Sequence, residues 1–325
     1  MRSCRIFARI LALGVLAVLS GALSAQQAYP NKPIRFIVPS PPGGSTDPMA
    51  RLAAQKLSEK WGQSVIVDNR PGGNTIIGTE AVAKAPPDGY TILLASTAFV
   101  TTPSLVPYLP YDTIKDFSAA ATIAKSRNVL VLNPSVPANS LRELIALAKS
   151  KPGQLNFASS GVGTSVHLAG ELFNIMAETK IQHIPYKGSG PLISDLIGGQ
   201  VQMSFQIPVS ALQHIKSGKL KAIAVTGEAR LATAPQIPTF AEAGLPGFDM
   251  TGWYAIVAPA ATPKAIIDKI SGDMAVILAM PETQEQLARQ GMEHYISTPA
   301  QVAALFKADI AKYARIIKSA NIKLE

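Results

Sequence analysis

The sequence predicts an α/β protein of two lobes, each a mostly parallel sheet flanked by helices, with two chain crossings that serve as a hinge. Strand and helix patterns alternate between residues 32 and 97, and they alternate again between residues 126 and 226. The chain has 325 residues, which is enough for each lobe to bury its own core. Two helix patterns near the C-terminus have no strand series of their own, so we expect them to complete the first lobe.

The first series contains three short apolar runs that predict strands and two helical patterns between them. The strands are expected at 34–38, 64–68 and 90–95, and the helices at 47–61 and 75–85. Asp47-Pro48 is interpreted as an N-cap followed by a first-turn proline. The helical stripe that should face the sheet consists of Met49, Leu52, Ala53, Leu57 and Trp61.

The second series repeats the alternation over a longer stretch. Its predicted strands are 128–132, 155–158, 181–184, 201–205 and 220–226, and its predicted helices are 140–150, 164–177, 189–198 and 208–217. Ser140 and Glu143 form a capping box, which places one helix start at 140.

The last part of the chain returns to the first lobe. We expect a strand over Gly252 to Pro259 and helices that start at Thr262-Pro263 and Thr298-Pro299. The predicted boundaries are therefore 26–125 with 254–325 for lobe 1 and 126–253 for lobe 2, with crossings near 118–127 and 245–255.

The N-terminal segment 1–25 has the layout of a secretory signal peptide. Arg2, Arg5 and Arg9 precede an apolar stretch, and small residues follow near Ser24 and Ala25. We expect export and cleavage. Cys4, the only cysteine, lies in this segment, so we expect no disulfide and no thiolate chemistry in the mature chain.

The charge of the chain is positive but scattered. The formal net charge is +9, and removal of the three arginines in the leader leaves 27 basic against 21 acidic residues. These residues form no long basic run and do not alternate with aromatic residues, so we expect no nucleic-acid partner. A mildly basic surface is suited to anionic solutes.

Two bends are built to expose main-chain amides. Residues 39–44 follow a predicted strand, and Gly43 and Gly44 let the backbone approach a ligand just before a helix begins. Residues 156–165 repeat this plan, with a strand, a serine- and glycine-rich bend and a second helix start. If the two bends face each other, they form a clamp for a carboxylate.

Polar residues at two further strand ends are candidate ligand contacts, because ligands bind at the carboxyl ends of parallel strands. Ser96 and Thr97 end one strand, and Gln206 follows another. The full set of predicted ligand contacts is Pro42, Gly43, Gly44, Ser45, Thr46, Asp47, Ser96, Thr97, Ser159, Ser160, Gly161, Gly163, Thr164, Ser165 and Gln206.

The motifs of several enzyme classes do not occur. The bend at 42–47 matches neither a Walker A loop nor a G-x-G-x-x-G fingerprint, and the four histidines have no metal-ligand spacing. We therefore expect no catalytic residue, no cofactor and no metal. An exported serine-dependent hydrolase stays open as an alternative, because Ser165 could pair with His167 or His183 through folding.

Motifs along nearly the whole mature chain resemble those of the Bug-type extracytoplasmic solute receptors of tripartite tricarboxylate transporters. The matching stretches are 29–34, 42–47, 67–72, 85–90, 159–161, 183–188, 195–201 and 242–247. Gln206 departs from the pattern, since relatives often carry Asp there, and Gly73-Asn74-Thr75 replaces a small Ala-Gly arrangement. The first departure concerns the polar end of the pocket and the second a surface loop.

The resemblance implies a type II-like periplasmic binding protein, a monomer that closes on a small organic carboxylate and delivers it to a large and a small membrane subunit. It implies that the bends at 42–47 and 159–165 hold the carboxylate. Dicarboxylates, acidic amino acids and aromatic or nicotinic carboxylates all stay open as ligands. A receptor that docks on a membrane signalling protein is a further alternative.

Overall fold

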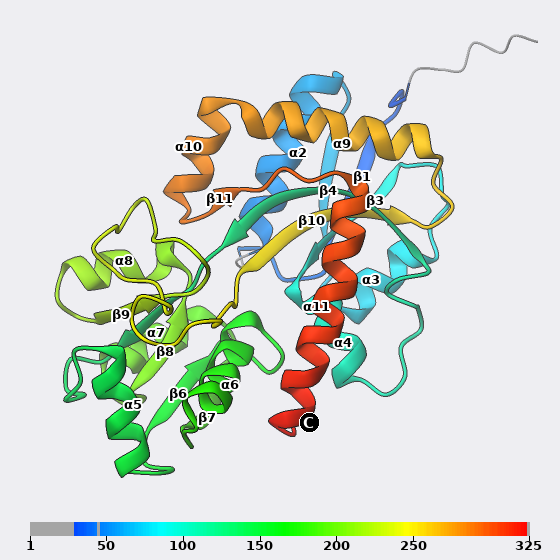
Figure 1. The fold of residues 1–325 in the computed structure, drawn as a ribbon. Helices are drawn as coiled ribbons and strands as arrows, with labels where there is room; N and C mark the ends of the chain where they lie inside the picture. Colours follow the sequence, from blue (N-terminus) through cyan, green and yellow to red (C-terminus); the bar gives the residue numbers. More distant parts are fainter. Residues whose placement is uncertain (1–28, 44–45, 324–325) are drawn as a thin grey trace, which may run out of the picture.

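The computed structural model describes residues 29–43 and 46–323, and two sheets flanked by helices lie side by side in it (Figure 1). The predicted leader 1–25 and its Cys4 lie outside the described residues. The strands of the first sheet, in spatial order, are β11 (Glu293–His294), β4 (Phe117–Ser126), β10 (Gly252–Pro259), β3 (Thr91–Ser96), β1 (Ile34–Val38) and β2 (Val65–Asn69). Those of the second sheet are β7 (Gln182–Pro185), β6 (Asn156–Ser159), β8 (Met203–Gln206), β5 (Val129–Leu132) and β9 (Lys221–Val225).

The sheets are mixed, although most of their strands point the same way. In the first sheet β1, β2 and β3 are parallel, and β10 is antiparallel to both β3 and β4. In the second sheet β6, β7 and β8 are parallel, and β5 is antiparallel to β8 and β9. The strands β5 and β10 are antiparallel because each enters its sheet directly after the chain has crossed from the other one.

Helices cover both faces of each sheet. Those of the first lobe are α2 (Asp47–Trp61), α3 (Ile76–Ala83), α4 (Thr97–Leu105), α9 (Lys264–Ala279), α10 (Pro281–Arg289) and α11 (Pro299–Ser319). Those of the second lobe are α5 (Leu141–Ser150), α6 (Ser165–Ala177), α7 (Ser189–Ile197) and α8 (Pro208–Lys216). Most predicted elements are present within a few residues, whereas α4, β4, α10 and β11 were not predicted as elements.

Two helix starts differ in detail from their predictions. Helix α2 begins at Asp47 with Thr46 as its N-cap, so the interpretation of Asp47 as the N-cap was wrong. Asp47 occupies the first helical position, and Pro48 follows it in the first turn. In the box at α5, Ser140 accepts from the Glu143 N–H as predicted, but the Glu143 carboxylate accepts from Asn139 N.

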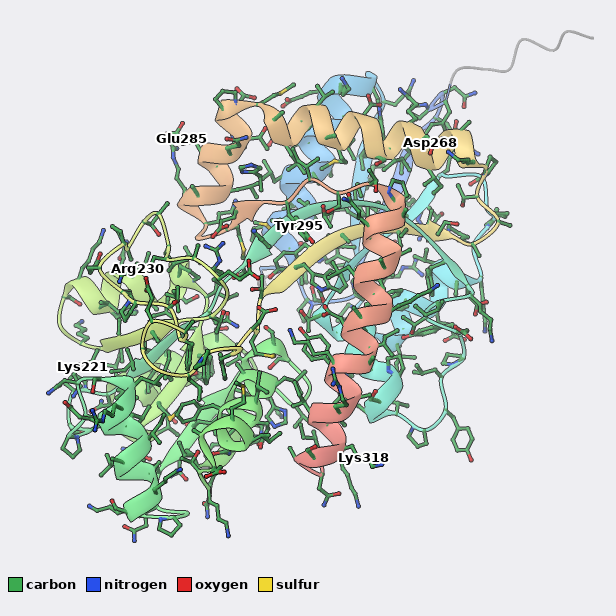
Figure 2. All side chains as sticks on the ribbon, viewed as in Figure 1. Lys221, Arg230, Asp268, Glu285, Tyr295 and Lys318 are labelled. Carbon is green, nitrogen blue, oxygen red and sulfur yellow. The ribbon has the colours of Figure 1, made fainter. Side chains whose placement is uncertain are left out.

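The chain crosses between the sheets at two adjacent places. Residues 127 and 128 join β4 to β5, and residues 226–251 lead from β9 to β10. Thr226 ties the crossings together, because its N–H donates to Asn128 O and its hydroxyl accepts from Asn128 N, both at 2.9 Å. The Arg127 guanidinium pairs with Glu293 at 2.7 Å and donates to the carbonyl of Arg230, which Figure 2 labels on the loop after β9. The predicted boundaries put Ser126, the last residue of β4, and Gly252 and Trp253, the first residues of β10, in lobe 2, whereas these strands belong to the first sheet, and the lobe boundaries stay a prediction.

Helix α11 runs along the flank of the first sheet towards α6 (Figure 1). Side chains of α11 hold the start of β10 in place. The Trp253 indole N–H donates to buried Asp309 at 2.6 Å, and the Trp253 ring stacks on Phe306. Burial raises the pKa of Asp309, although the hydrogen bond from Trp253 and the charge of Lys312 oppose it. The second crossing is therefore anchored where it enters the first sheet.

Close packing of α6 on β6 makes Gly170 a position of large expected effect. A Cβ atom at Gly170 would overlap the Phe157 ring, whereas one at Gly272, in the interior of α9, would meet no atom within 4 Å. Gly170→Ala is therefore expected to lower the free energy of unfolding by about 2 kcal/mol. Gly272→Ala should raise it by about 0.5–1 kcal/mol, because alanine favours helices. Urea unfolding of both variants measures the difference, and equal effects would contradict the packing described.

Candidate functional site

The carboxyl ends of β1 and β3 lie next to each other at the edge of the first sheet that faces the second lobe. Ile37 pairs with Leu93, so the same register continued places Ser40 beside Ser96. The first bend, residues 39–46, follows β1 at this edge, and α4 begins directly after Ser96. Gly252, the first residue of β10, pairs with Ser126 at the same edge. Parts of the chain that are far apart in sequence therefore meet at this edge.

Asp47 organises the first bend from inside. Its side chain is 6% exposed and accepts from Gly43 N at 3.0 Å, from Arg51 Nε at 2.8 Å and from Asn69 Nδ2 at 2.9 Å. Asn69 also donates to Ser40 O at 3.1 Å, and the hydroxyls of Ser40 and Thr46 contact each other. Burial tends to raise the pKa of the Asp47 carboxyl, but hydrogen bonds from Arg51, Gly43 and Asn69 outweigh it and hold this pKa below its usual value. The carboxylate is therefore charged and turned towards the protein.

This geometry divides the predicted residues of the first bend into two groups. Asp47 and Thr46 shape the bend, while Pro42 and Gly43 are exposed, and Gly43 has a left-handed φ of 76° that suits glycine. Gly44 and Ser45 lie outside the described residues. In the part of the chain that the structure describes, no side chain caps the first turn of α2. Its first amides are therefore not capped by the Thr46 side chain, while the charged Asp47 carboxylate in the same turn, which pairs with Arg51, offsets part of the helix dipole.

The second bend, residues 159–165, is also held by internal hydrogen bonds. Gly161 N donates to Ser159 Oγ at 3.2 Å, and Gly163 N donates to His167 Nδ1 at 3.0 Å. Both glycines have positive φ angles, 141° and 77°. Thr164 caps α6 by accepting from His167 N, and its hydroxyl donates to Gly161 O at 2.8 Å. The amides of Gly161 and Gly163, predicted as ligand donors, are thus already used within the bend.

Residues of both lobes meet beside Gly252. A Cβ atom placed there would lie 3.7 Å from Thr97 Oγ1 and 3.9 Å from Ser165 Oγ. Thr97 is the first residue of α4 and Ser165 the first residue of α6. Of the predicted contacts, Thr97 and Ser165 therefore both lie next to Gly252, although they belong to different lobes. Ser96 is the N-cap of α4 and makes no side-chain cap bond.

The lobes also touch where the second bend packs on α4. Thr101 Oγ1 donates to Gly163 O at 3.2 Å, and a Cβ atom at Gly163 would overlap the Leu105 side chain. On the other side, a Cβ atom at Gly291 would lie 2.7 Å from the amide nitrogen of Val209. The two lobes are therefore in contact at two places, at α4 and at α8.

Gln206 ends β8 and is 3% exposed. Ala158 pairs with Ser204, so the continued register places Gln206 beside Ser160. The Gln206 amide donates to Ser204 Oγ at 2.7 Å, and Ser204 in turn donates to Ala158 O. Gln206 is therefore fixed at the carboxyl edge of the second sheet, where it was expected, and one of its amide hydrogens is already used.

A serine and a histidine do meet, but in a different pair from those considered in the sequence. Ser159 Oγ lies 2.6 Å from His183 Nε2, and Ser159 is fully buried. His183 stacks on His167 with ring centroids 3.7 Å apart. Burial lowers the pKa of His183 to about 3, with a smaller contribution from His167. A buried hydroxyl beside so weak a base is poorly suited to attack a substrate.

The side chains that hold the bends were not identified in the sequence as site residues. Arg51 and Asn69 hold the first bend through Asp47, and His167 and His183 hold the second. His167 could have been found, because it stands three residues after the cap residue Thr164 and four after a glycine. The contact of Asn69 with Asp47 spans 22 residues and depends on the pairing of β1 with β2.

Comparison with known proteins identifies the family. Residues 49–322 match the family model described as "Tripartite tricarboxylate transporter family receptor". The chain belongs to this family. It is 38% identical to Protein BugT of Bordetella pertussis over 322 residues, covering 98% of this chain and 99% of BugT.

Two solved structures share the fold. One is R. palustris Rpa4515 with adipate, at 34% identity and a TM-score of 0.82, covering 91% of this chain and 100% of that one. The other is MatC from Rhodopseudomonas palustris with bound malate, at 27% identity and a TM-score of 0.78, covering 89% and 100%. The family assignment and the two-lobed fold predicted from sequence are confirmed. Within residues 29–43 and 46–323, no helix is long and apolar enough to cross a membrane.

Proposed function

We propose that this receptor captures a small organic carboxylate between its lobes in the periplasm and delivers it to the two membrane subunits of a tripartite tricarboxylate-type transporter. The observation that carries the proposal is the meeting of Thr97 and Ser165 beside Gly252, at the first residues of two helices from different lobes. Helix N-termini carry unpaired N–H groups and partial positive charge, so two of them at one gap favour an anion. The relatives with adipate and malate support the same class of ligand.

The proposed contacts come from both bends. Gly43 with Gly44 and Ser45 in the first bend, and Ser160 with Ser165 in the second, supply amides and hydroxyls. Ser96 at the end of β3 and Thr97 at the start of α4 add hydroxyls. Gln206 offers its amide to the far end of the ligand. Asp47 and Ser159 support the bends from within, because the first is turned inward and the second is buried.

Binding is coupled to closure of the lobes. Only a closed form lets the N-termini of α4 and α6 reach one ligand, so the ligand stabilises that form, and the transporter recognises it. The hinge is the pair of crossings joined through Thr226. We further propose that segment 1–25 directs export and is removed, and that the mature receptor acts as a monomer without catalysing a reaction.

Isothermal titration calorimetry tests the ligand class. The purified protein is first unfolded and refolded to remove ligand that co-purifies, and it is then titrated with malate, adipate, monocarboxylates and neutral and cationic solutes of similar size. Binding of one or more carboxylates with a stoichiometry near one is expected. Binding of a neutral or cationic solute, with no carboxylate bound, would show that the proposed ligand class is wrong.

A variant of Ser159, the serine that lies beside His183, distinguishes the hydrolase alternative from a receptor. Turnover of an ester or amide that Ser159→Ala abolishes would support an enzyme. A signalling receptor differs from a transport receptor in its membrane partner, so co-purification with the two membrane subunits favours transport.

A further inference from the structure

We propose that His167 and His183 are positioning residues that hold the bend 159–165 in its ligand-binding shape. This inference rests on the proposed function, because it concerns the same bend. The two imidazoles lie beneath the bend and form an internal scaffold made of two parallel rings, one from α6 and one from β7.

The first part of the scaffold fixes Gly163. His167 is 3% exposed, and its Nδ1 accepts the Gly163 N–H at 3.0 Å. An Nδ1 that accepts a hydrogen bond carries no proton, so the proton of the neutral ring is on Nε2. That nitrogen lies 3.5 Å from Glu171 Oε1, which favours this tautomer. The bond fixes the left-handed backbone of Gly163 just before the helix that supplies the ligand-facing N-terminus.

The second part fixes Ser159 and, through it, Gly161. His183 Nε2 lies 2.6 Å from Ser159 Oγ, which accepts the Gly161 N–H at 3.2 Å. His183 also stacks on Phe157, with centroids 4.9 Å apart, so its ring cannot turn without disturbing the β6 core. The lowered pKa of His183, caused first by burial and then by His167, keeps this ring neutral at physiological pH. Two neutral rings can stack closely without charge repulsion.

Some groups of the bend therefore hold its shape, and others are left to bind the ligand. The Gly163 amide binds His167 and the Gly161 amide binds Ser159, and this leaves Ser160, Ser165 and the first turn of α6 for the ligand. Loss of either internal bond would let the bend relax and move those groups. A role in packing alone would instead make only the volume of the side chain matter.

Two substitutions of His167 separate positioning from packing. His167→Leu fills the space but removes the acceptor, whereas His167→Asn places Oδ1 near the position of Nδ1 and can accept the Gly163 N–H. For a carboxylate that binds the wild-type protein, His167→Leu is expected to raise the Kd about tenfold or more, and His167→Asn should restore it to within about threefold. His294→Asn, at an exposed residue of β11, serves as the control and should leave the Kd unchanged.

Equal Kd values for the leucine and asparagine variants would overturn the proposal, whether both match the wild type or both are weakened alike. If His167→Leu does not fold, two-bond ¹H–¹⁵N correlation spectra of the wild-type imidazoles decide. A proton on Nε2 of His167 and none on Nδ1 supports the proposal, and a proton on Nδ1 overturns it. Failure of the proposed function would look different, since the wild-type protein itself would then bind no carboxylate.

Discussion

Asp47→Ala is expected to lower the free energy of unfolding by about 3 kcal/mol and to abolish measurable carboxylate binding. The substitution removes an acceptor that serves Gly43, Arg51 and Asn69, and hydrogen bonds to a charged group contribute roughly 1.5–3 kcal/mol each without being additive. Once these bonds are lost, Gly43 and the start of α2 are no longer joined to each other and to Asn69, although Asn69 still donates to Ser40 O. Chemical denaturation and calorimetry measure the two effects.

The matched control is Asp268→Ala. Asp268, labelled in Figure 2, pairs with Lys264 at the same i,i+4 spacing as Asp47 and Arg51, but both partners are exposed. Such pairs contribute about 0.5 kcal/mol or less, so stability and affinity should hardly change. Equal losses in the two variants would contradict the role assigned to Asp47.

The pH dependence of stability gives the same carboxylate an independent test. The pKa of Asp47 in the folded protein lies below the usual value of an aspartate, so the unfolded chain binds the proton more readily. The stabilisation is therefore complete above about pH 4 and is lost as the pH falls through the folded pKa. The stability difference between wild type and Asp47→Ala should shrink over that range and stay constant at neutral pH.

Gly163→Ala is expected to weaken carboxylate binding by about tenfold to a hundredfold. The residue has a φ of 77°, which costs a non-glycine residue about 1–2 kcal/mol, and the added Cβ would overlap Leu105 across the lobe interface. The strain distorts the second bend, and the overlap opposes closure. Both effects reduce affinity, which calorimetry measures directly.

Gly218→Ala separates backbone strain from the effect on the site. Gly218 has a similar φ of 71°, but it lies in the turn after α8, and a Cβ there would meet no atom within 4 Å. Gly218→Ala should lose about as much free energy of unfolding as the positive φ angle alone costs Gly163→Ala. Its Kd for the carboxylate should stay that of the wild type. The double variant with Leu105→Ala should recover part of the affinity lost by Gly163→Ala. No loss of affinity in Gly163→Ala would contradict the contact between the second bend and α4.

Much of the fold could be predicted because its signals are local. The apolar runs of β1 and β6 and the glycine-rich bends after them mark strand–bend–helix units by composition alone. The strand β4 was missed because 118–127 was interpreted as a crossing, and its alanine-rich segment has no strong preference for a strand. The short β11 is a strand only because Glu293 and His294 pair with β4.

The positions of the two bends were predictable, but the hydrogen bonds that shape them were not. Serines and glycines near strand ends indicated where the bends lie, and Thr97 and Ser165 do meet across the lobes. The direction in which each group points was not predictable, because it depends on partners that are distant in sequence. Asp47 turns inward towards Asn69, and Ser159 turns inward towards His183. Both contacts require the sheets to be assembled first.

A crystal structure of the refolded protein soaked with the carboxylate that binds best tests the central claim most directly. The claim predicts one carboxylate group between the bend at 39–46 and the bend at 159–165, within hydrogen-bond distance of main-chain amides from both lobes. A ligand that contacts only one bend, or that lies outside the gap beside Gly252, would contradict it.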